Sequence, residues 1–255
     1  MHLIHTPTFS LVLPCLNEEA TIGKIVKQSC SWMQKAGFTG EIIVVNNGSS
    51  DGTTRILGHL QKQIPQLRII NIGKTVGYGE CVMTGCDAAT MDLVAYMDSD
   101  GQLDVQEFSK LLPYLYSVDF VSGIRANRHD LFIRKVNSFC WNMLMRMALG
   151  IRAKDIDCGM KAFRRKIWRD IRPKFSKGIF LPAEMFYRVK KNKYSWAQET
   201  VRHFPRLHGK ATGAQLRVIL RAFLEFGLLF WREIFVQHLK PDQYQRIENY
   251  SLPLP

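Results

Sequence analysis

Short apolar runs alternate with amphipathic stretches along the first half of the chain. Four runs rich in strand-forming residues begin at Phe9, Glu41, Leu67 and Leu93, and each ends in a polar or glycine-containing turn. The stretches between them carry apolar residues at helical spacing. A further strand is predicted within Asp119–Arg128. Strands that alternate with helices over short links predict an α/β fold with a mostly parallel sheet flanked by helices.

After residue 128 the pattern changes to helices and basic loops. We expect a helix from about Phe132 to Leu149 to pack in the core, because it is rich in aromatic residues and methionine. The segment Ala214–Leu239 predicts an amphipathic helix with Arg217, Arg221 and Glu225 on one face. Its other face carries apolar residues: Leu216, Ile219, Leu220, Phe223, Phe226 or Gly227, and Phe230. We therefore expect a main domain over residues 1–213 and an appended helix and tail over 214–255.

Charge is divided unevenly along the chain. The net charge of +13 combines −4 for residues 1–123 with +17 for residues 124–255. So basic a second half favours anionic partners, which can be substrate phosphates, an anionic lipid surface or nucleic acid. No RNA-binding motif is recognisable, so we expect no nucleic-acid partner.

The cysteines and the hydropathy pattern indicate a compartment. The six cysteines form no CxxC pair and no zinc-like cluster, which predicts reduced thiols. Neither a signal peptide nor a run of about 18 apolar residues is recognisable. These features predict a protein on the cytoplasmic side, without indicating its oligomeric state.

A pair of carboxylates follows the fourth predicted strand. Asp98 and Asp100 are separated by one residue in MDSDGQ, so in an extended segment both side chains and that of Gln102 point the same way. Two carboxylates so close repel each other unless a cation lies between them. Oxygen ligands of this kind favour Mg²⁺ or Mn²⁺ shared with a diphosphate. In parallel sheets, ligands bind at this end of the strands.

A second polar turn follows the second predicted strand. Asn46, Asn47 and Gly48 offer short amide side chains and a permissive backbone to a ligand, although a simple connecting turn would look the same. Gly77 and Gly79 open a predicted helix and can face phosphate. The third glycine of a dinucleotide-binding motif is absent, which disfavours a Rossmann dinucleotide site.

The order of these motifs resembles glycosyltransferase family 2. The motifs are LPCLNEE, VVNNGSSDGT, GYGECVMTG, MDSDGQ, SGIRANR, DIDCGMKAFRR, AEMFYR and HFPRLHGKATG, over roughly residues 9–225. In particular, the chain resembles dolichyl-phosphate and polyprenyl-phosphate sugar transferases. The resemblance implies a GT-A fold, a UDP- or GDP-sugar donor and a divalent metal, Mg²⁺ or Mn²⁺.

The resemblance also implies roles for individual residues. Those matching the nucleotide-sugar site are Pro14, Asn17, Glu18, Asn47, Gly48 and Asp98, and those matching the metal site are Asp98, Asp100 and Gln102. Arg125 matches an arginine that contacts phosphate, and Asp157 matches an acidic residue on the acceptor side. Arg206 matches an arginine that is usually followed by Gly and a Ser or Thr. The chain departs from the family where Asn46-Asn47 replaces an acidic pair that contacts the base. It departs again after Gly209, where Lys210 and Ala211 stand in place of a hydroxyl residue.

Two acceptors agree with this site. A polyprenyl phosphate is largely a dianion at pH 7, because its second pKa is about 6, and would need cations rather than a strong base. Arg125, Arg134 and Arg206 are the candidates, and the amphipathic helix would lie on the cytoplasmic face of the membrane. A hydroxyl acceptor would instead need a general base, for which Asp157 is the candidate. An RNA-binding protein is the alternative from another class.

Overall fold

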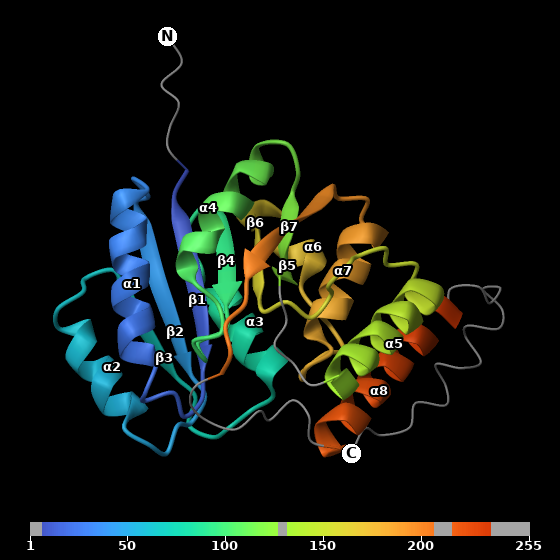
Figure 1. Ribbon diagram of the computed structural model, residues 1–255, viewed down its shortest axis with the longest axis horizontal. Helices are drawn as coiled ribbons and strands as arrows, with labels where there is room; N and C mark the ends of the chain where they lie inside the picture. Colours follow the sequence, from blue (N-terminus) through green and yellow to red (C-terminus); the bar gives the residue numbers. More distant parts are fainter. Residues whose placement is uncertain (1–6, 127–131, 207–215, 236–255) are drawn as a thin grey trace, which may run out of the picture.

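The computed structural model describes residues 7–126, 132–206 and 216–235. Its centre is a sheet of seven strands in the order β3-β2-β1-β4-β6-β5-β7 (Figure 1). The strands are β1 Phe9–Cys15, β2 Gly40–Asn46, β3 Leu67–Asn71, β4 Leu93–Met97, β5 Phe120–Ala126, β6 Met160–Arg164 and β7 Trp196–Arg202. The four strands expected in the first half and the fifth expected near residue 120 are all present.

The sheet is parallel except at β6. This strand runs antiparallel between β4 and β5, whereas all other neighbouring strands are parallel. The predicted mostly parallel α/β sheet is thus confirmed. The insertion of β6 was not predicted, because a pattern of apolar residues identifies a strand without specifying its neighbours.

Helices cover both faces of the sheet. They are α1 Ile22–Lys35, α2 Thr53–Gln61, α3 Tyr78–Ala88, α4 Phe108–Leu111, α5 Phe132–Leu149, α6 Trp168–Ile171, α7 Leu181–Lys191 and α8 Leu216–Phe230. Short helical turns are η1 Val105–Glu107, η2 Leu112–Tyr116, η3 Arg165–Ile167 and the π-helical η5 Trp231–Phe235. Side chains of α1, α2 and α4 share one core with one face of the sheet. Those of α3 and α5 to α8 share a second core with the other face.

Close packing fixes α3 against the sheet. A Cβ atom at Gly85 would lie 2.3 Å from Cγ1 of Val12 in β1 and 3.0 Å from Cγ2 of Val45 in β2. Only glycine lets the helix approach the strands this closely. The approach matters for the site, because the first turn of α3 reaches the carboxyl edge of the sheet.

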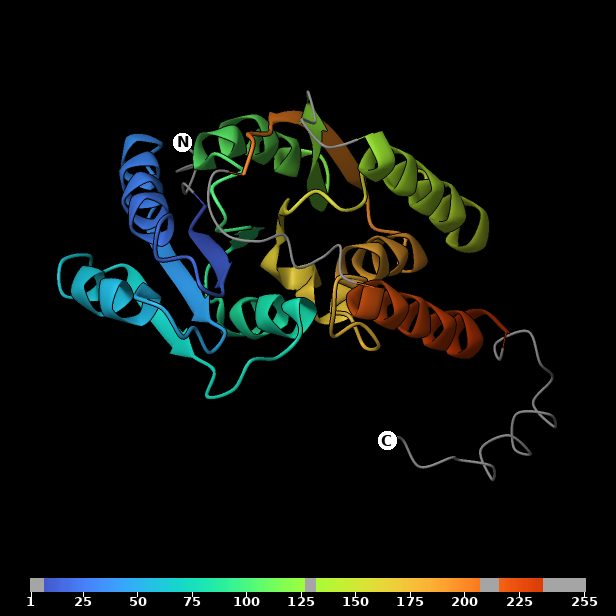
Figure 2. The ribbon, with the colours of Figure 1, turned by 60° about the horizontal axis from the view of Figure 1, so that its bottom comes forward.

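Helices α5 and α8 lie at the end of the molecule away from α1 and α2 (Figures 1 and 2). They contact each other through the rings of Trp141 and Phe223, whose centroids are 5.5 Å apart. Of α8, only Ala222, Glu225 and Leu229 are buried. The apolar residues exposed on α8 are Leu216, Leu220, Phe223, Leu224, Leu228 and Phe230. Glu225, which the sequence pattern placed on one face with Arg217 and Arg221, is buried, whereas these two arginines are exposed.

Helix α5 packs in the core with part of its described residues, as predicted. Met145 and Leu149 are buried, but Met143 and Met147 are exposed.

Within the described ranges, none of the helices has the length and apolar character needed to cross a membrane. All six cysteines are free thiols, four of them buried.

Candidate active site

The turns after β1, β2 and β4 meet at one edge of the sheet. Asp98 and Asp100 follow β4 directly, and their turn is tied to the turn after β1 by two hydrogen bonds. The hydroxyl of Ser99 donates to the carbonyl oxygen of Pro14 at 2.6 Å, and the hydroxyl of Thr21 donates to the carbonyl oxygen of Ser99 at 2.9 Å. Parallel strands end at a common edge, and this places Asp98 and Asp100 beside the turn that carries Asn17 and Glu18.

Arg206 reaches this edge from a distant part of the chain. Its Nη2 donates to Oδ2 of Asp100 at 2.6 Å and lies 3.9 Å from Oε1 of Glu18. Two hydrogen bonds between Gln102 and Phe204 fix the chain close to Arg206 and so position its side chain. The Phe204 amide donates to the Gln102 carbonyl oxygen at 2.9 Å, and Nε2 of Gln102 donates to the Phe204 carbonyl oxygen at 3.2 Å. The structure therefore brings Glu18, Asp100, Gln102 and Arg206 together.

The carboxylates at this edge lie in an environment that disfavours their negative charge. Burial and the neighbouring Asp100 raise the pKa of Asp98 to about 6, although the hydroxyl of Tyr78 donates to its Oδ1 at 2.7 Å. Burial also raises the pKa of Glu18 to about 7, and Asp100 adds to this effect. Nearby cations only partly offset the repulsion. A divalent cation at Asp98 and Asp100 would remove it.

The donor atoms fit a hard divalent ion that also binds a diphosphate. In the described part of the chain, no group of three or more His, Cys, Asp or Glu side chains is arranged to hold a metal. Binding of Mg²⁺ or Mn²⁺ by Asp98 and Asp100, with other positions filled by phosphate oxygens and water, stays a prediction. Gln102 as a third ligand stays a prediction.

The predicted nucleotide-binding residues hold several turns together. Asn17 adopts a left-handed backbone (φ 55°), and its Oδ1 accepts from the Ser50 amide at 2.8 Å. Asn47 forms two bonds with the main chain of Val76, its Oδ1 accepting at 2.8 Å and its Nδ2 donating at 3.0 Å. Gly48 has φ 70° beside Thr75. These contacts join the ends of β1, β2 and β3 into one surface, and nucleotide binding by Pro14, Asn17, Glu18, Asn47 and Gly48 stays a prediction.

The acceptor-side candidates are held by partners that the sequence did not reveal. Nε and Nη2 of Arg125 donate to the two carboxylate oxygens of Asp155, each at 2.8 Å, and the Arg125 side chain is only 14% exposed. Arg125 is thus not an ordinary surface cation. Arg134 belongs to the first turn of α5, but its side chain lies outside the described residues.

Asp157 lies on a loop that a buried lysine holds in place. Nζ of Lys161 donates to the carbonyl oxygens of Ile156 and Cys158, at 3.1 and 2.6 Å, on either side of Asp157. The Lys161 side chain is fully buried. Nearby in the sequence, Arg164 and Arg165 donate to the carbonyl oxygens of Leu115 and Ala89.

Three residues of the site were missed by sequence reasoning. Tyr78 contacts Asp98, Asp155 binds Arg125, and Lys161 supports the Asp157 loop. A signal for two of them was present in KDIDCGMKAF, where Asp155 and Asp157 alternate and a lysine interrupts an apolar strand. Nothing in the sequence signalled the contact of Tyr78, which depends on how α3 meets β4.

Known proteins resemble the chain in sequence and in fold. The dodecaprenyl-phosphate galacturonate synthase of Rhizobium johnstonii is 30% identical over 204 residues, which are 78% of this chain and 60% of that protein. The undecaprenyl-phosphate 4-deoxy-4-formamido-L-arabinose transferase of Pectobacterium atrosepticum is 31% identical over 176 residues, 68% of this chain and 54% of that protein. The dolichyl-phosphate beta-glucosyltransferase ALG5C of Trichomonas vaginalis is 30% identical over 183 residues, 64% of this chain and 54% of that protein. The chain thus spans only a little over half the length of these relatives.

Among solved structures, glucosyl-3-phosphoglycerate synthase from Mycobacterium tuberculosis has a similar fold. The two superpose with a TM-score of 0.67 at 22% identity, covering 87% of this chain and 80% of that one. The same protein has been solved with Mn²⁺ and UDP bound. This likeness confirms the predicted GT-A type of fold. Residues 10–172 match the family described as glycosyl transferase family 2, to which the chain therefore belongs.

Proposed function

We propose that the chain transfers a sugar from a UDP- or GDP-sugar to a polyprenyl phosphate, with inversion at the anomeric carbon. The observation that carries the proposal is the meeting of Asp98, Asp100, Glu18 and Arg206 at the carboxyl edge of the sheet in a family 2 chain. The names of all three relatives contain a polyprenyl or dolichyl phosphate, which supports this acceptor class.

The donor side would work through charge stabilisation. Mg²⁺ or Mn²⁺ bound by Asp98 and Asp100 would act as a Lewis acid for the leaving nucleoside diphosphate. The chain's own residues would orient the donor. Asn17, Asn47 and Gly48 line the turns where the nucleotide would lie, and Glu18 and Arg206 border the diphosphate side. The neighbouring structures with Mn²⁺ or Mg²⁺ and UDP agree with this arrangement in a shared fold.

The acceptor side would need cations more than a base. A phosphate monoester has a second pKa of about 6, so its oxygen is already nucleophilic at pH 7. Arg125 and Arg206 each pair with an aspartate, and Arg206 is the better-placed cation because its side chain is 25% exposed against 14% for Arg125. Arg134 is the third candidate. Asp157 would then orient the acceptor rather than remove a proton from it.

A membrane position is supported by the exposed surface of α8. Leu224 is 70% exposed, and Leu220, Leu228 and Trp231 are also exposed beside the exposed cations Arg217 and Arg232. Apolar residues flanked by arginines are typical of helices that lie in the interface of an anionic bilayer. We therefore place the protein peripherally on the cytoplasmic face of a membrane, where its acceptor would be.

The test of the reaction is release of nucleoside diphosphate. UDP- and GDP-sugars are supplied with Mg²⁺ or Mn²⁺, with and without a short polyprenyl phosphate, to the wild type and to Asp100→Asn. A matched control is Asp170→Asn, because Asp170 also accepts a hydrogen bond, from Tyr194, but lies on α6 away from the site. We expect release that requires both the metal and the lipid phosphate, disappears in Asp100→Asn and persists in Asp170→Asn.

Two other outcomes would contradict the proposal. Release that requires a hydroxyl acceptor and is lost in Asp157→Asn would show a hydroxyl-directed glycosyltransferase. Absence of release from every donor would show that the fold is not used for this reaction.

The membrane position has a separate test. Flotation with vesicles containing phosphatidylserine is compared for the wild type, for Leu224→Gln with Leu228→Gln, and for Tyr116→Gln. Tyr116 is a matched control because it is equally exposed but lies on η2. We expect only the α8 variant to lose vesicle binding, and equal binding by all three would refute the role of α8.

A further inference from the structure

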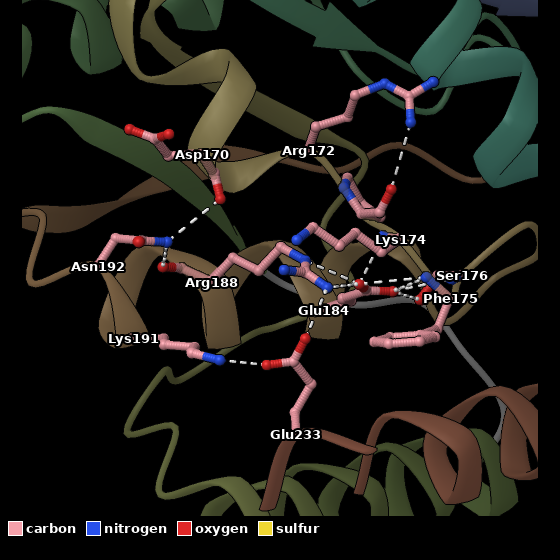
Figure 3. A network of polar contacts seen from close by, with 11 residues as sticks. Asp170, Arg172, Lys174, Phe175, Ser176, Glu184, Arg188, Lys191, Asn192 and Glu233 are labelled. Atoms are coloured by element: carbon pink, nitrogen blue, oxygen red, sulfur yellow. Dashed lines mark hydrogen bonds and ion pairs between the residues drawn. The ribbon is translucent and has the colours of Figure 1, made fainter. Parts of the chain in front are cut away.

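The loop between α6 and α7 is held by two buried carboxylates. Glu184 of α7 accepts from the amides of Lys174, Phe175 and Ser176, the shortest contacts being 2.6, 3.1 and 2.8 Å (Figure 3). Glu225 of α8 accepts from the next two amides, at 3.0 Å each. Five consecutive N–H groups, from residue 174 to residue 178, are thus bound by carboxylate oxygens, which fixes the path of this loop.

Glu225 is an unusual member of α8. It is 5% exposed, although its neighbours Phe223 and Leu224 face solvent. Its Oε1 accepts both loop amides and also a hydrogen bond from Nε of Arg221 at 3.2 Å. Burying a carboxylate is unfavourable unless such bonds compensate it. Helix α8 is therefore joined to the loop at Lys177 and Gly178.

The other side of the loop supports the first turn of α3. The amide of Glu80 donates to the carbonyl oxygen of Lys177 at 3.1 Å. A Cβ atom at Gly77 would lie 2.0 Å from that carbonyl oxygen, and one at Gly79 would lie 2.7 Å from the carbonyl oxygen of Gly178. In the structure, these two glycines thus serve the contact with the loop, whereas the sequence suggested that they face phosphate.

Tyr78 lies between the two glycines and connects this contact to the site. Its hydroxyl donates to Oδ1 of Asp98 at 2.7 Å. The other oxygen, Oδ2, packs against Gly159, where a Cβ atom would lie 1.8 Å away. The carboxylate of Asp98 is thus held from two sides. Its orientation depends on the position of α3, and so on the loop.

We propose that Tyr78 and Glu225 are positioning residues for Asp98. Glu225 holds the loop at Lys177 and Gly178, the loop holds the first turn of α3, and Tyr78 holds the Asp98 carboxylate in the orientation that binds the metal and diphosphate of the donor. This inference rests on the proposed use of Asp98 in donor binding. Glu225 belongs to α8, the helix that carries the exposed apolar surface. The proposed chain of contacts therefore connects α8 to the donor site.

The experiment measures donor-side binding without any acceptor. Mn²⁺-dependent binding of UDP and of GDP is titrated calorimetrically for the wild type, Tyr78→Phe, Glu225→Ala, Glu225→Gln and the double variant Tyr78→Phe with Glu225→Ala. A lost hydrogen bond to a charged group predicts about tenfold weaker binding for Tyr78→Phe. Glu225→Ala should weaken binding similarly, whereas Glu225→Gln should stay within about threefold of the wild type, because it keeps an acceptor oxygen for the loop amides.

The double variant distinguishes positioning from independent damage. If both residues act on Asp98 through one chain of contacts, the double variant should bind no more than about twofold more weakly than Tyr78→Phe. Independent effects would multiply to about a hundredfold. Two controls are matched in chemistry: Tyr194→Phe removes a Tyr–Asp hydrogen bond on another element, and Glu41→Gln changes a buried carboxylate of β2 that accepts from the amide of Thr90 at 2.9 Å. Both should bind like the wild type.

Folding is checked by thermal melting. If Glu225→Ala does not fold, Tyr78→Phe and Glu225→Gln still decide, since each retains the size of the side chain. Unchanged binding in a folded Tyr78→Phe overturns the inference, as do multiplicative effects in the double variant. Binding by the wild type without transfer to polyprenyl phosphate would refute the proposed acceptor and leave this inference standing. Binding of neither nucleotide by the wild type would overturn both.

Discussion

Replacing Glu18 by Gln should stabilise the protein at alkaline pH much more than at acidic pH. The Glu18 side chain is 13% exposed and lies near Asp100 and Asp51. Burial, the largest cause, raises its pKa from the ordinary value of 4.5 to about 7, although Thr21 and Arg206 lower it in part. The folded protein therefore has to accommodate a charge that the unfolded chain exposes to water. Glutamine has nearly the same shape and carries no charge.

The size of the effect follows from linkage between proton binding and folding. The folded pKa is higher than the unfolded one, so the contribution of Glu18 to stability is present at low pH and is lost as pH rises from about 4.5 to about 7. With a pKa difference of roughly 2.5, at about 1.4 kcal/mol for each unit, ionisation of Glu18 lowers the free energy of unfolding by roughly 3 kcal/mol at pH 8. At pH 5 the same relation gives a loss of about 1 kcal/mol. The advantage of Glu18→Gln should therefore grow by about 2 kcal/mol between the two pH values.

The assay is urea unfolding of both proteins at pH 5 and pH 8 without metal or nucleotide. Other carboxylates, including Asp98, titrate in both proteins, so their effects largely cancel in the difference. Glu19→Gln is the matched control, because Glu19 is the exposed neighbour and its Oε2 accepts only from the Gly52 amide at 2.7 Å. An equal free-energy difference at both pH values for Glu18→Gln would refute the reasoning.

Three further predictions follow from buried contacts. Asp155→Asn should lower the free energy of unfolding by about 3 to 5 kcal/mol, because it leaves the buried guanidinium of Arg125 without its charged partner. Denaturant unfolding measures this difference, and a decrease below about 1 kcal/mol would contradict the prediction. Gly85→Ala should lower the stability of the protein by about 1 to 3 kcal/mol, because the new methyl group would clash with Val12. Gly58→Ala, in the middle of α2 where nothing lies within 4 Å, should raise the stability by about 0.5 to 1 kcal/mol. Melting temperatures that shift in the same direction for both variants would argue against the close packing of α3 on the sheet. A thiol reagent should modify exposed Cys140 quickly and half-buried Cys30 slowly. The four buried cysteines should react only in denaturant, because burial shields their thiols and raises their pKa values; they are Cys15, Cys81, Cys86 and Cys158. Rapid reaction of all six in native buffer would contradict the structure.

The parallel half of the sheet and the meeting of its turns were predictable from local pattern. Apolar runs that alternate with helices have few ways to pair, and all their carboxyl ends lie at one edge. This is why Asp98 and Glu18 could be expected near each other. Arg206 in the same place could be expected only from the family resemblance, because no local pattern brings a residue 106 positions away to Asp100.

The supporting contacts were not predictable, since they are long-range and made by residues that look ordinary. Asp155 and Lys161 belong to a loop and strand whose placement depends on the inserted antiparallel β6. The sequence pattern grouped Glu225 with Arg217 and Arg221 on one polar face, and hydrophobic periodicity alone would place the apolar face inside. Helix α8 departs from this rule: its carboxylate is buried against backbone amides, whereas Leu216, Leu220, Leu224 and Leu228 are exposed. Periodicity shows that a helix is amphipathic, but not which face the protein covers.

Part of the positive charge of residues 124–255 stabilises the fold through hydrogen bonds and ion pairs. Several of its cations bind main-chain carbonyl oxygens, as Lys161, Arg165 and Lys190 do, and others pair with buried acids, as Arg188 does with Glu184. Lys161 and Arg188 are buried and add little to a surface that meets anions, whereas Arg165 and Lys190 stay exposed. On α8 and η5, Arg217, Arg221 and Arg232 are exposed near exposed apolar side chains such as Leu220 and Leu224. Exposed cations and exposed apolar side chains lie together on this helix, so under the proposed function we expect α8 to contribute more to attraction to an anionic membrane than an equal number of cations elsewhere on the surface.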